Sequence, residues 1–229
     1  MLKGQALEKI RTRVPDIVRI LRRRYPHSRT ALEYRTPLQV LVATILAAQC
    51  TDERVNKVTP GLFQHYPDAA ALAAADPLVL QDEIRSTGFF RNKAKNIIGA
   101  GKTLVRDFGG EVPRTMEELL TIPGVARKTA NIVLSSGFGR AEGIAVDTHV
   151  RRLAGRLGLS RENDPEKIER DLLAVVPKKD WLDFNYMLVN HGRRVCPARK
   201  PLCPECALAA LCPSAVKYYP EMKRKKAGG

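Results

Sequence analysis

The sequence predicts an all-α protein built from many short helices and tight turns, and three observations support this prediction. Apolar side chains recur at the spacing of one helix face at Ile10, Val14, Ile17, Val18 and Leu21. Residues 38–49, LQVLVATILAAQ, are apolar nearly all round, which is typical of a helix buried in a core. No segment alternates apolar and polar residues for long enough to form a β-sheet.

Further short helices are expected after the buried helix, because turn signals divide the chain at regular points. These signals are YPD at 66–68, ADP at 75–77, STGFF at 86–90, FGGEVP at 108–113 and IPG at 122–124. The sequence contains no internal repeat of fixed period. A chain of 229 residues is long enough for one or two compact domains with cores of their own.

The charge balance is strongly basic. Lysine and arginine total 39 against 24 acidic residues, a formal net charge of +15. Such a surface favours polyanions, and nucleic acid is the first candidate; a ribosome-surface or membrane-surface protein, or a merely basic enzyme, is the alternative. Residues 218–229, YYPEMKRKKAGG, have little to bury, so we expect a basic flexible tail there. Its basic residues could contact DNA, although a solvated tail is the simpler interpretation.

The N-terminus shows no uninterrupted apolar segment of the kind that a secretory signal needs. The longest apolar run, residues 38–48, has about 11 residues and is too short to span a bilayer. Glu8 and Asp16 argue weakly against a transit peptide. We therefore expect a cytoplasmic protein, in which paired structural disulfides are rare.

Four of the five cysteines lie close together near the C-terminus. Cys196, Cys203, Cys206 and Cys212 form a C-x6-C-x2-C-x5-C run, which indicates metal ligation. Structural zinc modules usually bring two close pairs, and only one is present, so the spacing favours a [4Fe–4S] cluster over zinc. The cluster could be redox-active, or it could simply fold a loop.

The loop between the first two of these cysteines, CPARKPLC, carries Arg199 and Lys200. A rigid loop would project both cations, so a phosphate contact is one interpretation and simple solubility is the other. Cys50, by contrast, stands alone in the predicted core helix and is expected to be a small buried apolar residue.

Residues 115–136, TMEELLTIPGVARKTANIVLSS, predict a helix, a tight turn and a second helix. Small residues at such a turn allow close backbone approach, and free N–H groups at the start of the second helix can bind a phosphate. Contacts of this kind hold the DNA backbone rather than the bases. The candidate phosphate-binding residues are Pro123, Gly124, Val125, Ala126 and Arg127.

Lys128 lies in the first turn of the predicted second helix. The positive end of the helix and the neighbouring Arg127 both disfavour a cationic amine and so favour its nucleophilic form. Asn131 and Ser135 extend a polar stripe from Lys128, which suits either a cleft wall or a solvated face. Local chemistry alone favours a phosphate-binding or surface lysine over a nucleophile.

A second candidate group is Asp147, in the segment IAVDTHVRRL at 144–153. An aspartate at a helix start is most often just an N-cap. A carboxylate held in that way is also rigid and ionised, so near a lysine and a DNA backbone it could stabilise a cationic sugar transition state.

Taken together, IPGVARKTA, AVDTH and the cysteine run resemble the endonuclease III family, the helix–hairpin–helix DNA glycosylases with an iron–sulfur cluster. The resemblance extends from RTPLQVLVATILAAQCTDERVN at 35–56 to the last cysteine. It implies a two-domain all-α fold: a six-helix domain over residues 30–142, and a helical cluster domain formed by residues 1–29 and 143–217. It also implies that double-stranded DNA lies across the cleft between the domains.

The resemblance further implies a role for each matching residue. Lys128 matches the nucleophile and Asp147 the essential carboxylate of a bifunctional DNA N-glycosylase and AP lyase. Such an enzyme removes oxidised pyrimidines through a lysine Schiff base and nicks the strand by β-elimination. Gln49 matches a residue that fills the gap left by the flipped nucleotide, Phe89 occupies the wedge position, and His149 matches a position that contacts the lesion or the cleft.

The implied protein is a bacterial, cytoplasmic monomer that associates with the nucleoid through DNA containing a damaged pyrimidine or an abasic site. Two residues depart from the family pattern: Ala126 replaces the second glycine of the hairpin, and Phe89 replaces a leucine. Both phenylalanines could instead lie in the core, which is the simpler interpretation for Phe90. The alternatives are a non-catalytic iron–sulfur protein that binds DNA or senses redox state, and a mismatch-type glycosylase of the same fold. Lys128 favours the bifunctional enzyme, because mismatch relatives tend to carry tyrosine there.

Overall fold

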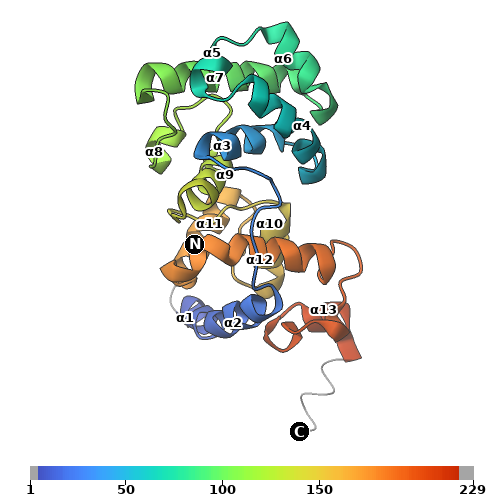
Figure 1. The fold of residues 1–229 in the computed structure, drawn as a ribbon. Helices are drawn as coiled ribbons and strands as arrows, with labels where there is room; N and C mark the ends of the chain where they lie inside the picture. Colours follow the sequence, from blue (N-terminus) through green and yellow to red (C-terminus); the bar gives the residue numbers. More distant parts are fainter. Residues whose placement is uncertain (1–4, 222–229) are drawn as a thin grey trace. The chain divides into compact units, whose positions relative to one another are not determined.

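The computed structural model describes residues 5–221, and every regular element in that range is a helix (Figure 1). The prediction of an all-α fold is therefore confirmed. Contacts between Cα atoms divide the described residues into two compact units, residues 30–142 and residues 5–29 with 143–221. Of the predicted tail, residues 222–229 lie outside the described residues. No helix in the described part of the chain has the length and apolarity that a membrane crossing requires.

The unit formed by residues 30–142 is built around its longest helix, α7, which packs against α5 and α6. Its helices are α3 (Pro37–Leu46), α4 (Asp52–His65), α5 (Ala69–Ala73), α6 (Pro77–Glu83), α7 (Phe90–Phe108), α8 (Met116–Leu119) and α9 (Arg127–Ile132), with a 3-10 turn η1 (Arg85–Thr87) and a π-helical turn η2 (Val133–Gly137).

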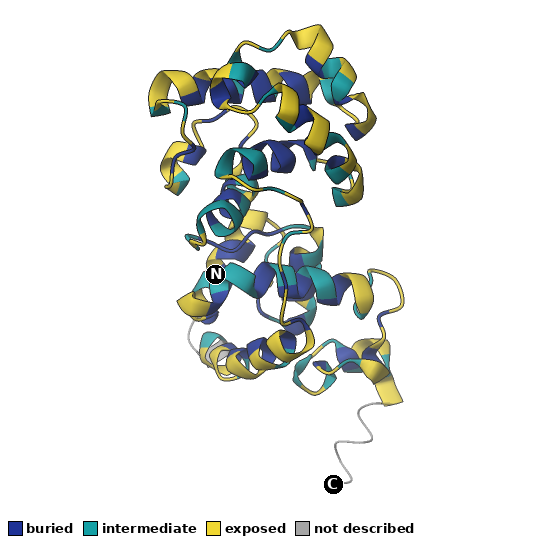
Figure 2. Cartoon of the chain, in the orientation of Figure 1, coloured by how far each residue is buried: buried dark blue, intermediate teal, exposed yellow. Residues whose placement is uncertain are grey.

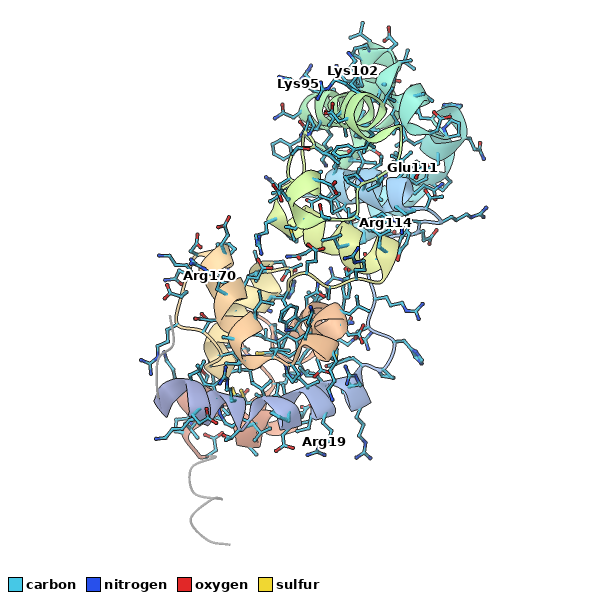
Figure 3. The ribbon with its side chains drawn as sticks, turned by 90° about the vertical axis from the view of Figure 1, so that its left-hand side faces the viewer. Arg19, Lys95, Lys102, Glu111, Arg114 and Arg170 are labelled. Atoms are coloured by element: carbon cyan, nitrogen blue, oxygen red, sulfur yellow. The ribbon has the colours of Figure 1, made fainter. Side chains whose placement is uncertain are left out.

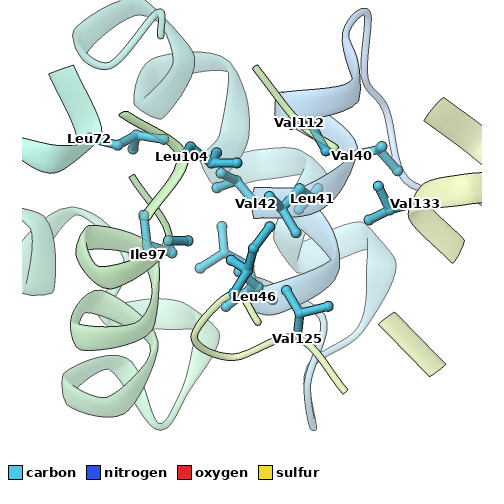
Figure 4. Close-up of a cluster of buried hydrophobic side chains, with 14 of the residues drawn as sticks. Val40, Leu41, Val42, Leu46, Leu72, Ile97, Leu104, Val112, Val125 and Val133 are labelled. Carbon is cyan, nitrogen blue, oxygen red and sulfur yellow. The ribbon is translucent and has the colours of Figure 1, made fainter. Parts of the chain in front are cut away.

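Helix α3 lies in the core of this unit. It begins at Pro37, behind the N-cap Thr36 whose side chain accepts from the Gln39 N–H, and all its residues from 40 to 46 are buried. Figure 4 shows Leu41 and Leu46 of α3 in one apolar cluster with Ile97 of α7. The buried helix was predicted to extend to residue 49, and that end is wrong: α3 stops at Leu46 because the chain reaches a left-handed conformation at Gln49.

The second unit joins the two ends of the chain. Its helices are α1 (Gln5–Arg11), α2 (Val14–Arg24), α10 (Thr148–Leu157), α11 (Pro165–Val175), α12 (Trp181–Arg194) and α13 (Ala215–Tyr218), with 3-10 turns η3 (Lys178–Asp180), η4 (Cys203–Glu205) and η5 (Ala209–Leu211). Helix α12 packs against α10 and α2. The inner helix faces are buried and the outer ones exposed (Figure 2).

The apolar face predicted near the N-terminus is buried at all five positions, which confirms the periodicity. It belongs to two helices rather than one, however. The chain leaves α1 at Arg11 and starts α2 at Val14. Pro15 accounts for the break, because it has no N–H to donate to the preceding turn and is tolerated only at the start of a helix.

Candidate active site and nucleic-acid interface

Lys128 is the second residue of α9 and its side chain is exposed. The helix begins after Ala126, which has an extended backbone and supplies no side-chain cap. Ala130 and Asn131 turn toward the core. Of the predicted polar stripe beside Lys128, Asn131 is only 5% exposed and so does not lie on a solvated face.

The turn before α9 depends on Gly124. Its φ is +80°, and a Cβ added there would lie 2.8 Å from the Cβ of Asn96 on α7. A left-handed residue with no room for a side chain has to be glycine. Val125 follows in the core, and its N–H donates to the Ile122 carbonyl at 3.1 Å. The backbone of this hairpin is thus held against α7 while Pro123 and Gly124 are exposed.

Ala126 adopts φ −94° and ψ 169°. Extended backbone of this kind is open to any residue, so an alanine in place of the family glycine keeps the turn geometry. Its neighbour Arg127 starts α9 and is half-buried. The first N–H groups of α9 have no capping side chain from Ala126, as a phosphate-binding helix start requires.

Gln49 and Phe89 share an unusual backbone. Among residues 5–221 they are the two non-glycine residues with positive φ, at 54° and 49° respectively. Both are exposed, and Phe89 exposes 63% of its surface directly before α7. Phe90 packs against the core, which confirms its predicted role. Strained non-glycine residues concentrate at functional sites, so this geometry agrees with a role for Gln49 and Phe89 on DNA.

Asp147 is the N-cap of α10. Its backbone is extended and its Oδ1 accepts the Val150 N–H at 2.8 Å, so the predicted N-cap geometry is present. Two residues further on, the Nδ1 atom of His149 lies 3.1 Å from the guanidinium of Arg152. His149 also lies against Gly192 of α12, where a Cβ would come within 2.9 Å of its ring. This packing holds His149 between Arg152 and α12, and no pattern in the sequence predicts it.

The four C-terminal cysteines line one pocket together with apolar residues of α10 and the C-terminal turns, including Leu153, Leu157 and Leu208. Burial raises the pKa of the Cys206 thiol to about 11 and raises the pKa of Cys203 and Cys212 as well. All five cysteines in the described chain are free. Four thiols around one apolar pocket are the donor set that an iron–sulfur cluster uses.

The four thiols are not gathered around a single metal ion. Between residues 5 and 221, no group of three or more histidine, cysteine or acidic side chains is arranged closely enough to hold a metal ion. Two neighbours nevertheless face the sulfur atoms: Arg156 donates to Cys196 Sγ at 3.1 Å, and His191 Nε2 lies 3.4 Å from Cys206 Sγ. Hydrogen bonds to the ligand sulfurs are common around iron–sulfur clusters.

Arg156 of α10 contacts the loop that carries Arg199 and Lys200. Arg156 donates to the carbonyls of Pro197 at 2.8 Å and Ala198 at 2.7 Å. Arg199 and Lys200 themselves are exposed. Arg156 was missed by sequence reasoning, although its spacing of four residues from Arg152 on one helix was a usable signal.

Lys93 of α7 was also missed. Its side chain is buried, at 3% exposure, and its Nζ contacts two backbone carbonyls. The signal was present in the sequence, since Lys93 occupies a position on the apolar face of α7 that continues through Ile97 and Leu104. A lysine at such a position needs polar partners, because an unpaired buried charge is costly.

Comparison with known proteins identifies the superfamily of this chain. Residues 42–178 match the model of the HhH-GPD superfamily of base excision DNA repair proteins. A trapped endonuclease III–DNA covalent intermediate has the same fold, with a TM-score of 0.85, 38% identity and coverage of 95% of this chain and 99% of that one. A thermostable thymine-DNA glycosylase gives a TM-score of 0.80 at 26% identity, covering 95% of this chain and 100% of that one.

Two relatives identify the family within this superfamily. Endonuclease III of Synechocystis sp. is 60% identical over 94% of this chain and 97% of its own length. Endonuclease III of Bacillus subtilis is 46% identical over 82% of this chain and 86% of its own. The chain therefore belongs to the endonuclease III family of the HhH-GPD superfamily. It is a DNA glycosylase with AP lyase activity in base excision repair.

Proposed function

We propose that this enzyme removes oxidised pyrimidines from double-stranded DNA and uses Lys128 as its nucleophile. The observation that carries the proposal is the exposed Lys128 amine in the first turn of α9, directly after the hairpin. The DNA complex of a relative described as a trapped covalent intermediate supports a covalent step of this kind. Abasic sites, which lack the base, would be substrates for the lyase step alone.

In the proposed reaction the Lys128 nitrogen attacks C1′ of the damaged nucleotide, and the bond from C1′ to the base breaks. The base leaves with the bonding electrons and takes up a proton. The sugar ring then opens to give the Schiff base between Lys128 and C1′. Loss of a proton from C2′ expels the 3′ phosphate by β-elimination, and water releases the enzyme.

Asp147 would stabilise the positive charge that develops on the sugar and assist the proton transfers. Its Oδ1 is held by the Val150 N–H, so the carboxylate is fixed without help from the substrate. The hairpin residues 123–127 would bind the DNA backbone, and His149 would contact the lesion. Gln49 and Phe89 would occupy the space left when the damaged nucleotide rotates out of the duplex.

We also assign the four C-terminal cysteines to a [4Fe–4S] cluster, on the basis of the four free thiols around one pocket. When bound, the cluster supplies a covalent cross-link that would rigidify the C-terminal loop. Arg199 and Lys200 would then contact phosphates from this loop. We expect a bacterial cytoplasmic monomer that associates with the nucleoid through DNA.

Borohydride trapping tests the nucleophile. The wild-type protein is incubated with a duplex containing thymine glycol, and reduction should yield a covalent protein–DNA complex. Lys128→Ala should abolish the complex, whereas Lys102→Ala, which removes an exposed lysine of α7, should leave it intact. Trapping by Lys128→Ala at the wild-type level would show that another amine attacks. Salt-sensitive duplex binding without nicking by the wild type would instead favour a non-catalytic DNA-binding protein.

A further inference from the structure

Lys93 joins two segments of the unit formed by residues 30–142. Its Nζ lies 2.7 Å from the carbonyl oxygen of Leu46 and 2.7 Å from that of Thr87. Leu46 is the last residue of α3, and Thr87 is the last residue of η1. Carbonyls at helix ends lack partners within the helix, and a lysine ammonium is a suitable donor to them. One buried cation thus caps the C-terminal ends of two helices.

The two capped ends lead directly into the two strained residues. Gln49 follows Leu46 by three residues, and Phe89 follows Thr87 by two. The Phe89 carbonyl accepts the Lys93 backbone N–H at 3.1 Å, which is the first hydrogen bond of α7 and does not involve the lysine side chain. Gly88, between Thr87 and Phe89, has φ +70°, so the whole approach to Phe89 departs from ordinary backbone geometry.

Residues in left-handed or similarly sparse conformations are strained and persist only where their surroundings hold them. Neither Gln49 nor Phe89 is held by burial of its own side chain, since both are exposed. Lys93 is buried, charged and bonded to both approaches. Lys93 is therefore a contact that both strained turns share.

We propose that Lys93 is a positioning residue that holds Gln49 and Phe89 in the geometry needed to open the duplex at a lesion. The inference rests on the proposed function, in which these two side chains replace the flipped nucleotide. Lys93 touches neither the sugar nor the base, and it acts only through the two turns. It differs in this from Lys128, whose amine takes part in the chemistry.

The alternative is that Lys93 only stabilises the fold. A matched control on the same helix separates the two: Lys102 has the same charge, lies on α7 and is exposed (Figure 3). Lys93→Met keeps the length of the side chain but removes the three donors, whereas Lys102→Met removes an equal charge without a buried partner. Any effect of net charge on DNA binding is then common to both variants.

Two substrates separate duplex opening from chemistry. The first is a duplex with 2-aminopurine beside the lesion, whose fluorescence rises when its stacking is disturbed. The second, the gapped substrate, is a duplex with an abasic site and no nucleotide opposite it. No base therefore has to be displaced at this position. On the first substrate, the single-turnover excision rate of Lys93→Met should fall at least about tenfold, which corresponds to roughly 1.4 kcal/mol. Most of the fluorescence rise should be lost as well. Borohydride trapping on the second should change by less than about twofold.

Three results would overturn the proposal. The first is equal excision rates for Lys93→Met and Lys102→Met on the first substrate, and the second is an equal loss of activity by Lys93→Met on both substrates. The third is that the losses of activity add in a double-mutant cycle. In the cycle, Lys93→Met is placed in a Gln49→Ala/Phe89→Ala background, where the proposal expects almost no further loss. If Lys93→Met does not fold, Lys93→Gln takes its place, because it keeps an N–H donor but loses the charge, and the same three results would then overturn the proposal. Failure of the wild type to trap on the gapped substrate would refute the proposed function instead.

Discussion

Replacing Gly124 by alanine should destabilise the hairpin by a calculable amount. The residue has φ +80°, and left-handed backbone costs a non-glycine residue about 1–2 kcal/mol. The new Cβ would also lie 2.8 Å from the Cβ of Asn96 and 3.0 Å from its Cγ, distances that real Cβ atoms avoid. Forcing extra volume into a packed contact adds about 1–3 kcal/mol. The expected loss in unfolding free energy is therefore about 2–5 kcal/mol.

Gly109→Ala is the matched control for the steric part. Gly109 ends α7 with φ +59°, and a Cβ placed there meets nothing within 4 Å. This variant should lose only the conformational cost of about 1–2 kcal/mol. The difference between the two variants isolates the contact with Asn96.

Urea denaturation of both variants measures these losses, and duplex binding as a function of salt measures the effect on the interface. Gly124→Ala should weaken binding of an undamaged duplex, because the hairpin must shift away from α7 to accept the Cβ. Gly109→Ala should bind as the wild type does. Equal unfolding free energies for the two variants would refute the steric argument, and unchanged duplex binding by a destabilised Gly124→Ala would remove the hairpin from the interface.

Two further predictions follow from single groups. Asp147→Asn keeps a capping side chain and should unfold like the wild type in urea, whereas the unfolding free energy of Asp147→Ala should fall by about 1 kcal/mol. The rate of base release should fall sharply in both variants. A fully active Asp147→Asn would contradict the electrostatic role. Burial lowers the pKa of Lys93 below its usual value near 10.5. At a pH between the lowered and the usual pKa, residue 93 is protonated more often in the unfolded chain than in the folded one. The stability of the wild type relative to Lys93→Met should therefore rise with pH in that alkaline window. Urea titrations at several pH values check this, and a relative stability that falls or stays flat would contradict it.

Much of this structure follows from local patterns in the sequence. The apolar face of α2, the buried α3, the glycine turn and the N-cap at Asp147 are all set by residues within one or two turns of each other. The errors arose where a distant segment decides the outcome. The Leu46 carbonyl at the end of α3 contacts Lys93 of α7, and the buried Asn131 belongs to α9, which packs against α3. Lys93 could be suspected from its apolar position, but its two carbonyl partners lie 47 and 6 residues away and only the fold brings them together.

The second unit shows how a loop far along the chain can influence the carboxylate at the start of α10. Asp147 caps that helix, and Arg152 and Arg156 lie one and two turns further along it. Arg152 donates to the carbonyls of Gly192 and Cys196, both at distances of 3.0–3.1 Å. Arg156 holds the next residues of the cysteine loop. The same rigid helix therefore carries the capping carboxylate and fastens the loop, so a change in the position of Cys196 acts on the helix that fixes the orientation of Asp147.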